Sequence, residues 1–220
     1  MFILKVLTIL KTIFIHYQCI LCLQKTKQGL CQHCQNALAK ESLLHKRRKL
    51  TINGQPITLY AFNHFEGLTR KLLFLFKYQK NHIAGVFLGQ YMKKAFQRQP
   101  FLNDVDYILP VPSHRLRFLV RGFNQAEILA KHIIKQNQIL DIRSIKRMKY
   151  TKPQAKSNYQ QRQIQMHNVF IQTKSISAQH LLIVDDVYTT GATITSLVNT
   201  LQNEPTNQIT KISILTLCLA

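Results

Sequence analysis

The chain has 220 residues, of which 46% are apolar, and it carries 30 Lys and Arg against nine Asp and Glu, a net charge of +21. This length excludes more than one sizeable domain with a small appendage, and the apolar fraction is high enough for a packed core. Because so large a charge repels itself in a compact chain, it favours a polyanionic partner, with nucleic acid ahead of a membrane surface. A generally basic protein without such a partner is the simpler alternative.

Residues 2–17 form an apolar segment that Lys5 and Lys11 interrupt. No uninterrupted span reaches the length of a bilayer, and no small-residue cleavage site follows, which disfavours an anchor or a signal peptide. We predict a helix that docks on its own domain, with peripheral membrane contact as the alternative. The expected location is the cytoplasm, with the inner face of the membrane as a further option.

Two Cys-x-x-Cys motifs follow, separated by eight residues that include Gly29. Each motif presents two thiolates to one tetrahedral ion, and the link between them can fold back as a hairpin. Two disulfides are disfavoured without a secretion signal, and a redox dithiol needs only one motif. The spacing therefore predicts a structural zinc site whose ligands are Cys19, Cys22, Cys31 and Cys34.

The basic run Lys46-Arg-Arg-Lys49 and the polar pair Asn53-Gly54 are interpreted as a boundary. We expect an N-terminal module over residues 1–50 and a main domain over residues 51–220. The basic run itself is either a solvated linker or a phosphate contact. Three further residues could bind a metal but are not predicted to do so. His16 and His33 are interpreted as bystanders of the zinc site, and Cys218 as a core residue of the last strand.

Strands and helices are expected to alternate in the main domain. Apolar runs predict strands, and spacings of three and four residues predict helices. The expected strands cover 56–62, 105–112, 139–145, 181–184 and 209–219, and the expected helices follow Gly67, span 83–97, follow Gln125 and begin at Thr193.

The segment 113–125 is expected to be an arginine-bearing loop after the second of these strands. Arginine forks pair bidentately with the oxygens of a pyrophosphate, and a glycine frees the backbone just where the next helix starts. The pyrophosphate candidates are Ser113, Arg121 and Gly122. Arg115 and Arg117 are either ligand contacts or simply solvated.

The segment 147–170 is polar and basic, with aromatic residues at intervals. Such a segment suits a mobile cover over an active site or a stacking surface for single-stranded bases. A plain surface loop is the alternative, although long unstructured loops are uncommon in compact domains. Together with two arginines of the preceding loop, this gives the DNA-contact candidates Arg115, Arg117, Arg147, Lys149, Tyr150, Lys152, Tyr159 and Arg162.

The stretch 181–193 combines a buried strand, two adjacent acids and a small-residue turn that opens a helix. Free N–H groups at a helix N-terminus favour a phosphate, and the acids before it suit sugar hydroxyls or the water shell of a hard cation. A solvated turn with an ordinary helix cap is the alternative, disfavoured because charge at the end of an apolar strand is costly. The predicted phosphosugar site comprises Asp185, Asp186, Thr189, Thr190, Gly191, Ala192 and Thr193.

This stretch resembles the signature of type I phosphoribosyltransferases, which implies that the acids face the ribose of phosphoribosyl pyrophosphate and that residues 189–193 wrap its 5-phosphate. The whole chain resembles the ComF family, specifically the ComFC type of bacterial competence proteins. That resemblance rests on the paired cysteine motifs, Lys77-Tyr78, Pro110-Val-Pro112, Arg121-Gly-Phe-Asn-Gln125, Thr151-x-Pro-Gln154 with Arg162, and residues 185–193.

The family resemblance implies an α/β fold, a type I phosphoribosyltransferase-like parallel-sheet domain with a small N-terminal zinc-ribbon module. It implies structural Zn²⁺, and Mg²⁺ together with phosphoribosyl pyrophosphate or a related phosphosugar. It also implies that the protein handles incoming single-stranded DNA during natural transformation, beside a helicase-like ATPase. The spacing between Arg162 and Phe170 departs from the family pattern, so Asn168 receives no role.

Whether the chain catalyses a reaction stays open at this point. One alternative is an active phosphoribosyltransferase of the nucleotide-salvage type, which would transfer the ribosyl group as pyrophosphate departs. No residue stands out as a general base for an acceptor. Another alternative is a zinc-stabilised adaptor that docks the ATPase and leaves the pocket unused.

Overall fold

The computed structural model describes residues 17–41, 46–97, 100–148 and 169–220. These residues belong to two compact units, of which the first ends at Glu41 and the second begins at Ser42. Residues 2–16 of the predicted N-terminal helix lie outside the described part of the chain, as do the candidates Lys149, Tyr150, Lys152, Tyr159 and Arg162.

The N-terminal unit contains a short hairpin followed by a helix. The strands β1 (Tyr17–Gln18) and β2 (Lys25–Thr26) pair antiparallel, and α2 (Gln32–Glu41) follows. Gly29, with φ of 73°, turns the chain between β2 and α2 in a conformation that glycine adopts without strain. A unit of this size buries little apolar surface and usually needs a metal or a disulfide to fold.

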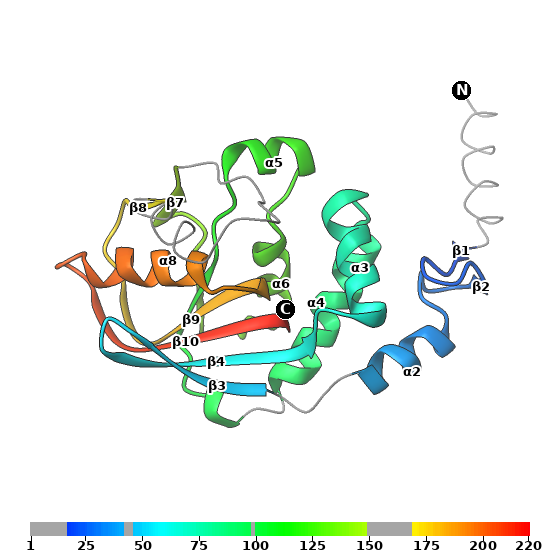
Figure 1. The fold of residues 1–220 in the computed structure, drawn as a ribbon, viewed down its shortest axis with the longest axis horizontal. Coiled ribbons are helices and arrows are strands. Elements are labelled where there is room, and N and C mark those ends of the chain that lie inside the picture. Colours follow the sequence, from blue (N-terminus) through cyan, green and yellow to red (C-terminus); the bar gives the residue numbers. More distant parts are fainter. Residues whose placement is uncertain (1–16, 42–45, 98–99, 149–168) are drawn as a thin grey trace. The chain divides into compact units, whose positions relative to one another are not determined.

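The second unit is built on a six-stranded sheet in the order β3-β4-β10-β9-β5-β6 (Figure 1). Neighbouring strands from β4 to β6 run parallel, and β3 pairs antiparallel with β4 at one edge. The predicted mixed α/β class with a mostly parallel sheet is therefore confirmed. The strands are β3 (Lys46–Ile52), β4 (Gln55–His64), β5 (Tyr107–Pro110), β6 (Ile139–Leu140), β9 (Ser177–Tyr188) and β10 (Gln208–Leu219).

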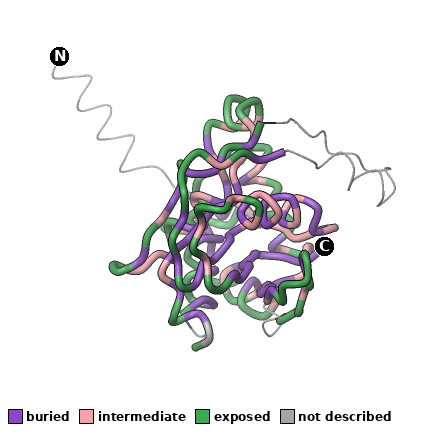
Figure 2. Tube along the Cα trace, turned by 90° about the vertical axis from the view of Figure 1, so that its left-hand side faces the viewer, coloured by how far each residue is buried: buried purple, intermediate pink, exposed green. Residues whose placement is uncertain are grey.

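The C-terminal strand β10 lies in the middle of this sheet, between β4 and β9. Every residue from Ile212 to Leu219 is buried, and so is every residue from Leu181 to Val184 of β9. Because successive side chains of a strand point to opposite faces, such runs must be covered on both faces. Figure 2 colours the buried stretches of the chain purple. Burial on both faces explains why both segments are continuous apolar runs in the sequence.

In the described part of the second unit, α8 and α6 pack on the sheet, and two further helices pack outside α6. The apolar stripe of α8 shares one buried cluster with Leu181 and Ile183, while Leu182 and Val184 face the other way and are equally buried. Helix α6 packs against β5 and β9, α4 packs against α6, and α3 packs against α4. Their bounds are α3 (Gly67–Tyr78), α4 (His82–Gln97), α6 (Gln125–Ile133) and α8 (Ala192–Gln202).

The predicted boundary near residue 50 differs from the structure, which divides the chain between residues 41 and 42. The basic run 46–49 is part of β3, where Lys49 lies opposite Thr58. Asn53 and Gly54 have φ of 49° and 77°, as a two-residue hairpin turn requires. The polar pair therefore marks a turn within the sheet, and the basic residues before it belong to an edge strand.

Two further expectations are corrected by local structure. The segment expected to be an arginine loop contains a short helix, α5 (Arg115–Arg121). The single strand expected near residues 139–145 is divided into β6 and β7 (Ile145–Arg147), which pairs antiparallel with β8 (Phe170–Gln172). The break falls at Asp141, which accepts backbone hydrogen bonds from Arg143 and Ser144. A short 3₁₀ helix also spans Pro100–Leu102.

Candidate functional site

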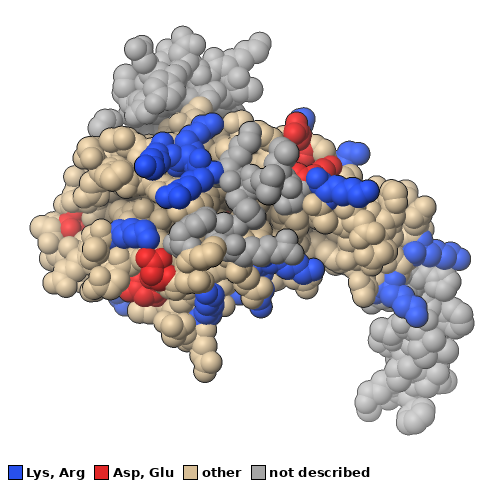
Figure 3. Space-filling view, turned by 90° about the horizontal axis from the view of Figure 1, so that it is seen from below, with Lys and Arg blue, Asp and Glu red and all other residues tan. Residues whose placement is uncertain are grey.

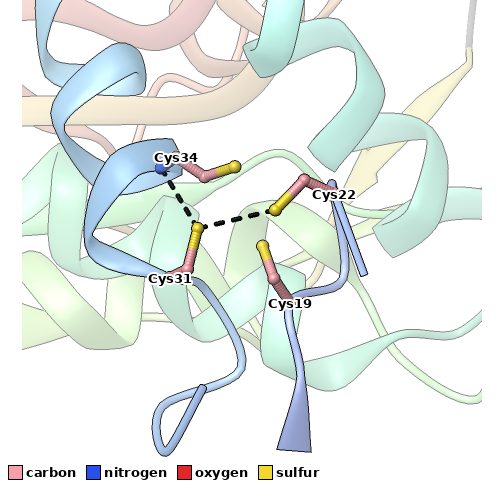
Figure 4. Close-up of side chains that lie close together, drawn as sticks. All are labelled: Cys19, Cys22, Cys31 and Cys34. Atoms are coloured by element: carbon pink, nitrogen blue, oxygen red, sulfur yellow. Dashed lines mark hydrogen bonds between the residues drawn. The ribbon is translucent and has the colours of Figure 1, made fainter. Parts of the chain in front are cut away.

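The four cysteines of the two Cys-x-x-Cys motifs form one cluster (Figure 4). Their sulfur atoms all lie within 4.8 Å of one another, and the Sγ atoms of Cys22 and Cys31 are 3.5 Å apart. Four sulfurs bound to one tetrahedral zinc would be about 3.8 Å apart, since each Zn–S bond is about 2.3 Å long. The cluster can therefore hold a metal such as zinc, and all four predicted ligands meet in it.

The surroundings of the cluster shift the pKa values of its cysteines in opposite directions. Burial opposes ionisation of Cys19, but backbone hydrogen bonds near Cys31, Leu21 and Cys22 outweigh it and lower its pKa to about 6. Burial raises the pKa of Cys34 instead. All five cysteines lie in the described part of the chain, and none of them forms a disulfide. Cys218 is fully buried in β10, as predicted for a core residue.

A second candidate site is a cleft of about 330 Å³ at the carboxyl ends of β5 and β9. Open parallel sheets commonly bind ligands at this edge, because the loops that follow several strands meet there. The cleft is also lined by the end of α3, by α5, by the start of α6 and by β7. Its charged lining residues are Lys77, Arg117, Arg121, Arg147, Asp185 and Asp186.

The predicted phosphate loop begins after β9 and opens α8. Gly191 is the N-cap of this helix and has φ of 78°, a conformation that favours glycine. A Cβ at this position would also collide with the phenol group of Tyr188, first with its hydroxyl and then with the adjoining ring carbons. Thr189 and Thr193 line the cleft. The first N–H groups of α8 have no partner within the helix, so this loop offers donors to an anion.

The two acids stand in different environments at the end of β9. Asp186 forms an ion pair with Lys77, with Oδ2 2.7 Å from Nζ, and both side chains are largely buried, at 14% and 17% exposure. Asp185 accepts a hydrogen bond from the backbone N–H of Asp186. Burial, followed by the negative charge of Asp186, raises the pKa of Asp185 to about 7, although Lys77 and Arg147 oppose that rise.

The arginines of the cleft are held by aromatic and amide groups. Arg121 lies over the ring of Tyr78 and donates to Oε1 of Gln125 at 3.0 Å. Arg147 is only 8% exposed and lies over the ring of Phe170. Burial, followed by the positive charge of Arg117, lowers the pKa of Arg147 to about 10, and Asp185 opposes this. Buried Arg147 and half-buried Arg121 favour an anionic ligand.

Sequence reasoning missed Gln125 as a lining residue. It is the first residue of α6 and only 4% exposed, and its Nε2 has no hydrogen-bond partner within the described part of the chain. Buried donors are nearly always paired in folded proteins, so this amide suits a ligand or a water molecule in the cleft. Its only sequence signal was its place at the end of Arg121-Gly-Phe-Asn-Gln125.

The structure brings most of the remaining candidates to this edge. Ser113, Arg117 and Arg121 line the cleft, as does Arg147, which lies inside it and not on an exposed surface. Arg115 lines a neighbouring apolar pocket of about 390 Å³ that shares Ser113 and Arg147 with the cleft. Gly122, with φ of 86°, ends α5 and shapes the loop between the arginines and α6.

The structure thus defines an α/β protein with a mostly parallel sheet, a cleft at the carboxyl edge of that sheet and a separate unit that holds the four-cysteine cluster. No family model matches the chain. It is 26% identical over 177 residues to competence protein F of Haemophilus influenzae, a match that covers 77% of this chain and 72% of that protein.

Two further similarities cover shorter stretches. Over 102 residues the chain is 30% identical to the DNA utilization protein YhgH of Escherichia coli O157:H7 and 29% identical to that of Shigella flexneri. Each of these matches covers 46% of this chain and 45% of the relative, so less than half of either relative is spanned. Together the matches confirm the predicted relationship to the ComF family: the chain is a homologue of competence protein F.

Proposed function

We propose that the protein binds single-stranded DNA during DNA uptake and holds a phosphoribosyl ligand in the cleft at the carboxyl edge of its sheet. The proposal rests on three groups that line one cavity: the acidic pair Asp185 and Asp186, the loop 189–193 that opens α8, and three arginines. The names of the relatives, a competence protein and a DNA utilization protein, support a role in DNA uptake.

The chemistry of the cleft suits a sugar that carries phosphates at two ends. The N-terminus of α8 offers N–H donors and the positive end of its dipole to one phosphate. Arg121 and Arg147 suit a second phosphate, because guanidinium forks pair with its oxygens. The acids between them suit sugar hydroxyls. Phosphoribosyl pyrophosphate has this arrangement, and a type I phosphoribosyltransferase-like fold is the architecture that we propose for the second unit.

The proposed DNA contact is the basic surface beside this cleft. Helix α5 carries Arg115, Arg117 and Arg121 but contains no buried residue. Its side chains Leu116, Phe118 and Leu119 are 52%, 47% and 75% exposed, so apolar groups stand next to the cations. Figure 3 shows the side away from α5, where Lys and Arg are also spread over the surface with a few acids between them. Single-stranded nucleic acid binds to such mixed surfaces through its phosphates and its bases.

Three further parts of the proposal have separate grounds. Structural zinc in the four-cysteine cluster rests on the spacing of its motifs and on the meeting of the four sulfur atoms. A helicase-like ATPase as a partner comes from the family resemblance, and a cytoplasmic location, with peripheral membrane contact as the alternative, comes from the N-terminal segment. Among the helices within residues 17–41, 46–97, 100–148 and 169–220, none is long and apolar enough to cross a membrane. Four protein ligands close a tetrahedral site, so zinc there would support folding and not catalysis.

The deciding experiment is a titration of labelled single-stranded oligonucleotide into the full chain at two salt concentrations, with and without phosphoribosyl pyrophosphate. We expect binding that weakens with salt, with a slope of about −0.7 per neutralised phosphate. A change in this affinity on addition of the phosphosugar would couple the cleft to DNA. Binding that is undetectable or independent of salt would contradict the proposal.

A second candidate function is an active phosphoribosyltransferase, and the position of Asp185 in the lining of the cleft favours it. The carboxyl of Asp185 has its pKa raised to about 7, so near neutral pH it can both accept and release a proton beside the proposed ribose site. The reaction would form a bond from a nitrogen acceptor to the anomeric carbon as pyrophosphate leaves. Release of pyrophosphate only when a base is added would establish this function, and its absence with every base would exclude it.

A further inference from the structure

Lys77 is a charged residue of the cleft to which the sequence assigns no role. Lys77 lies in the last turn of α3, where a cation is favoured by the helix dipole, and its ammonium contacts Asp186 at 2.7 Å. Both residues line the cleft. The ammonium therefore stands inside the candidate site, against the carboxylate that a hard cation would use.

The neighbours of Lys77 hold it in that place. Phe76 is fully buried, and its ring stacks on that of Phe123 with centroids 4.9 Å apart. On the other side, Tyr78 lies under the guanidinium of Arg121. One aromatic pair and one cation–π contact thus hold the last turn of α3 in place. This turn positions the ammonium of Lys77 against Asp186.

The other charged groups around the acidic pair are also cations. The cleft has four Lys and Arg side chains among its lining residues and two carboxylates. Arg147 interacts electrostatically with Asp185, and Arg117 lies close enough to Arg147 to lower its pKa. A divalent cation would have to displace the ammonium from Asp186 and sit among these positive charges. The residues present therefore fit Mg²⁺ at the acidic pair poorly.

We propose that the ammonium of Lys77 takes the place of a divalent cation at the acidic pair and excludes such a metal from the cleft. An ammonium has three N–H donors, and Asp186 occupies one of them. The others are directed to a sugar hydroxyl or a phosphate oxygen. The consequence for ligands, which rests on the proposed phosphosugar pocket, is that a phosphorylated sugar binds without Mg²⁺.

The first test uses Mn²⁺ alone as the probe and electron paramagnetic resonance of the full, zinc-loaded chain. We expect no Mn²⁺ bound by the wild type and one ion bound by Lys77→Met, because that variant leaves the two carboxylates without their ammonium. The double variant Lys77→Met/Asp186→Asn should lose the ion again. Lys71→Met is the matched control, since Lys71 is exposed on the same helix.

Two results would overturn the proposal. One is a wild type that binds Mn²⁺ in a manner abolished by Asp186→Asn. The other is a Lys77→Met chain that keeps the wild-type circular dichroism spectrum and still binds no Mn²⁺. If Lys77→Met fails to fold, Lys77→Gln provides the same loss of charge with a polar side chain, and the same two outcomes decide.

The second test measures binding of ribose 5-phosphate by calorimetry in buffer freed of divalent ions, with and without added Mg²⁺. The wild type should bind equally well in both. Lys77→Met should bind at least about tenfold more weakly without Mg²⁺, as expected for loss of one charged hydrogen bond, and should recover when Mg²⁺ is added.

Wild-type binding that requires Mg²⁺ would overturn the proposal that Lys77 replaces the metal. If neither ribose 5-phosphate nor phosphoribosyl pyrophosphate binds to either chain, with or without Mg²⁺, the proposed phosphosugar pocket is contradicted instead. The Mn²⁺ experiment is independent of that failure, so it still decides whether Lys77 excludes a metal.

Discussion

The four-cysteine cluster and the cleft are built in opposite ways. The four cysteines come from residues 19–34, a single hairpin-and-helix segment. The charged groups of the cleft come from Lys77 at the end of α3 through to Asp186 at the end of β9, and only the folded sheet brings them together. A cluster that is local in sequence should respond to loss of its ligand by itself, whereas the cleft should respond to anything that disturbs the sheet edge.

Removal of zinc should give the largest effect and should be confined to the N-terminal unit. Structural zinc in small modules contributes an apparent binding free energy on the order of 10 kcal/mol, because the apo module is unfolded. We expect chelation to abolish the dispersed amide signals of residues 17–41 in NMR spectra and to leave those of the second unit in place. Signals from residues 17–41 that persist after metal removal would contradict this prediction.

Variants test the same separation. Cys31→Ser should lower the measured zinc content, since one of the four clustered thiols is removed. Cys218→Ala is the control, because Cys218 lies in β10 and should leave one zinc per chain. A control that also lost its zinc would mean that the two units depend on each other for folding.

Substitution of Gly191 should give the next largest effect. Gly191→Ala combines a positive φ with a collision against the phenol group of Tyr188, whereas Gly122→Ala has a positive φ of 86° and open space around the new Cβ. We expect Gly122→Ala to lower the free energy of unfolding by about 1 kcal/mol and Gly191→Ala by at least about 2 kcal/mol. Urea denaturation measures both.

The same two variants separate an effect on stability from an effect on ligand binding. Gly191→Ala should also weaken binding of ribose 5-phosphate, because the loop that opens α8 must shift. Gly122→Ala should leave that affinity unchanged, because ribose 5-phosphate lacks the second phosphate that we assign to the α5 side of the cleft. Equal losses of stability in the two variants would refute the predicted collision with Tyr188.

The acidic pair should give a smaller effect that depends on pH. The folded-state pKa of Asp185 is raised to about 7 from its ordinary value of 3.8, so the folded chain binds more protons than the unfolded chain between these values. The contribution of Asp185 to the free energy of unfolding is therefore greatest at low pH and is lost as the pH rises from about 4 to about 7. Above that range Asp185 destabilises the fold.

Asp185→Asn isolates this contribution, since an amide oxygen can still accept the backbone hydrogen bond from Asp186. We expect the variant to be more stable than the wild type at pH 8, by roughly a few kcal/mol at most. The difference should shrink and vanish near pH 4. Parallel urea titrations at several pH values measure it, and a constant difference across that range would show that the pKa of Asp185 is not raised.

The local character of the cysteine cluster explains why the sequence predicted all four of its members. The strand from Leu181 to Val184 and the loop that follows it could also be predicted, because a buried strand and a helix start leave strong local patterns in the sequence. The order of the strands in the sheet could not be predicted, since nothing local in β10 indicates that the last strand lies between β4 and β9. The mostly parallel α/β class could nevertheless be predicted.

The cleft shows where local patterns fail. Lys77 ends an amphipathic helix and Gln125 begins another, so the local pattern assigned neither residue a role although both belong to motifs of the family resemblance. Arg147 was grouped with exposed basic residues, yet it is buried against Phe170 through the pairing of β7 with β8. The acid-rich end of β9 predicted a ligand site, but its cationic partners depend on the packing of α3 and β7 around it.

The smallest expected effect concerns the surface of α5, where single charges act on DNA through phosphates and not through structure. Arg115→Ala should reduce the salt dependence of oligonucleotide binding by about 0.7 in the logarithmic slope if Arg115 neutralises one phosphate. Arg48→Ala is the matched control, because Arg48 is an exposed arginine of β3 at the opposite edge of the sheet from β5 and β6. Both variants should keep the wild-type free energy of unfolding. A slope that falls equally in the two would mean that DNA is attracted by the net charge of the chain as a whole, and that α5 and the cleft beside it hold no particular place in binding.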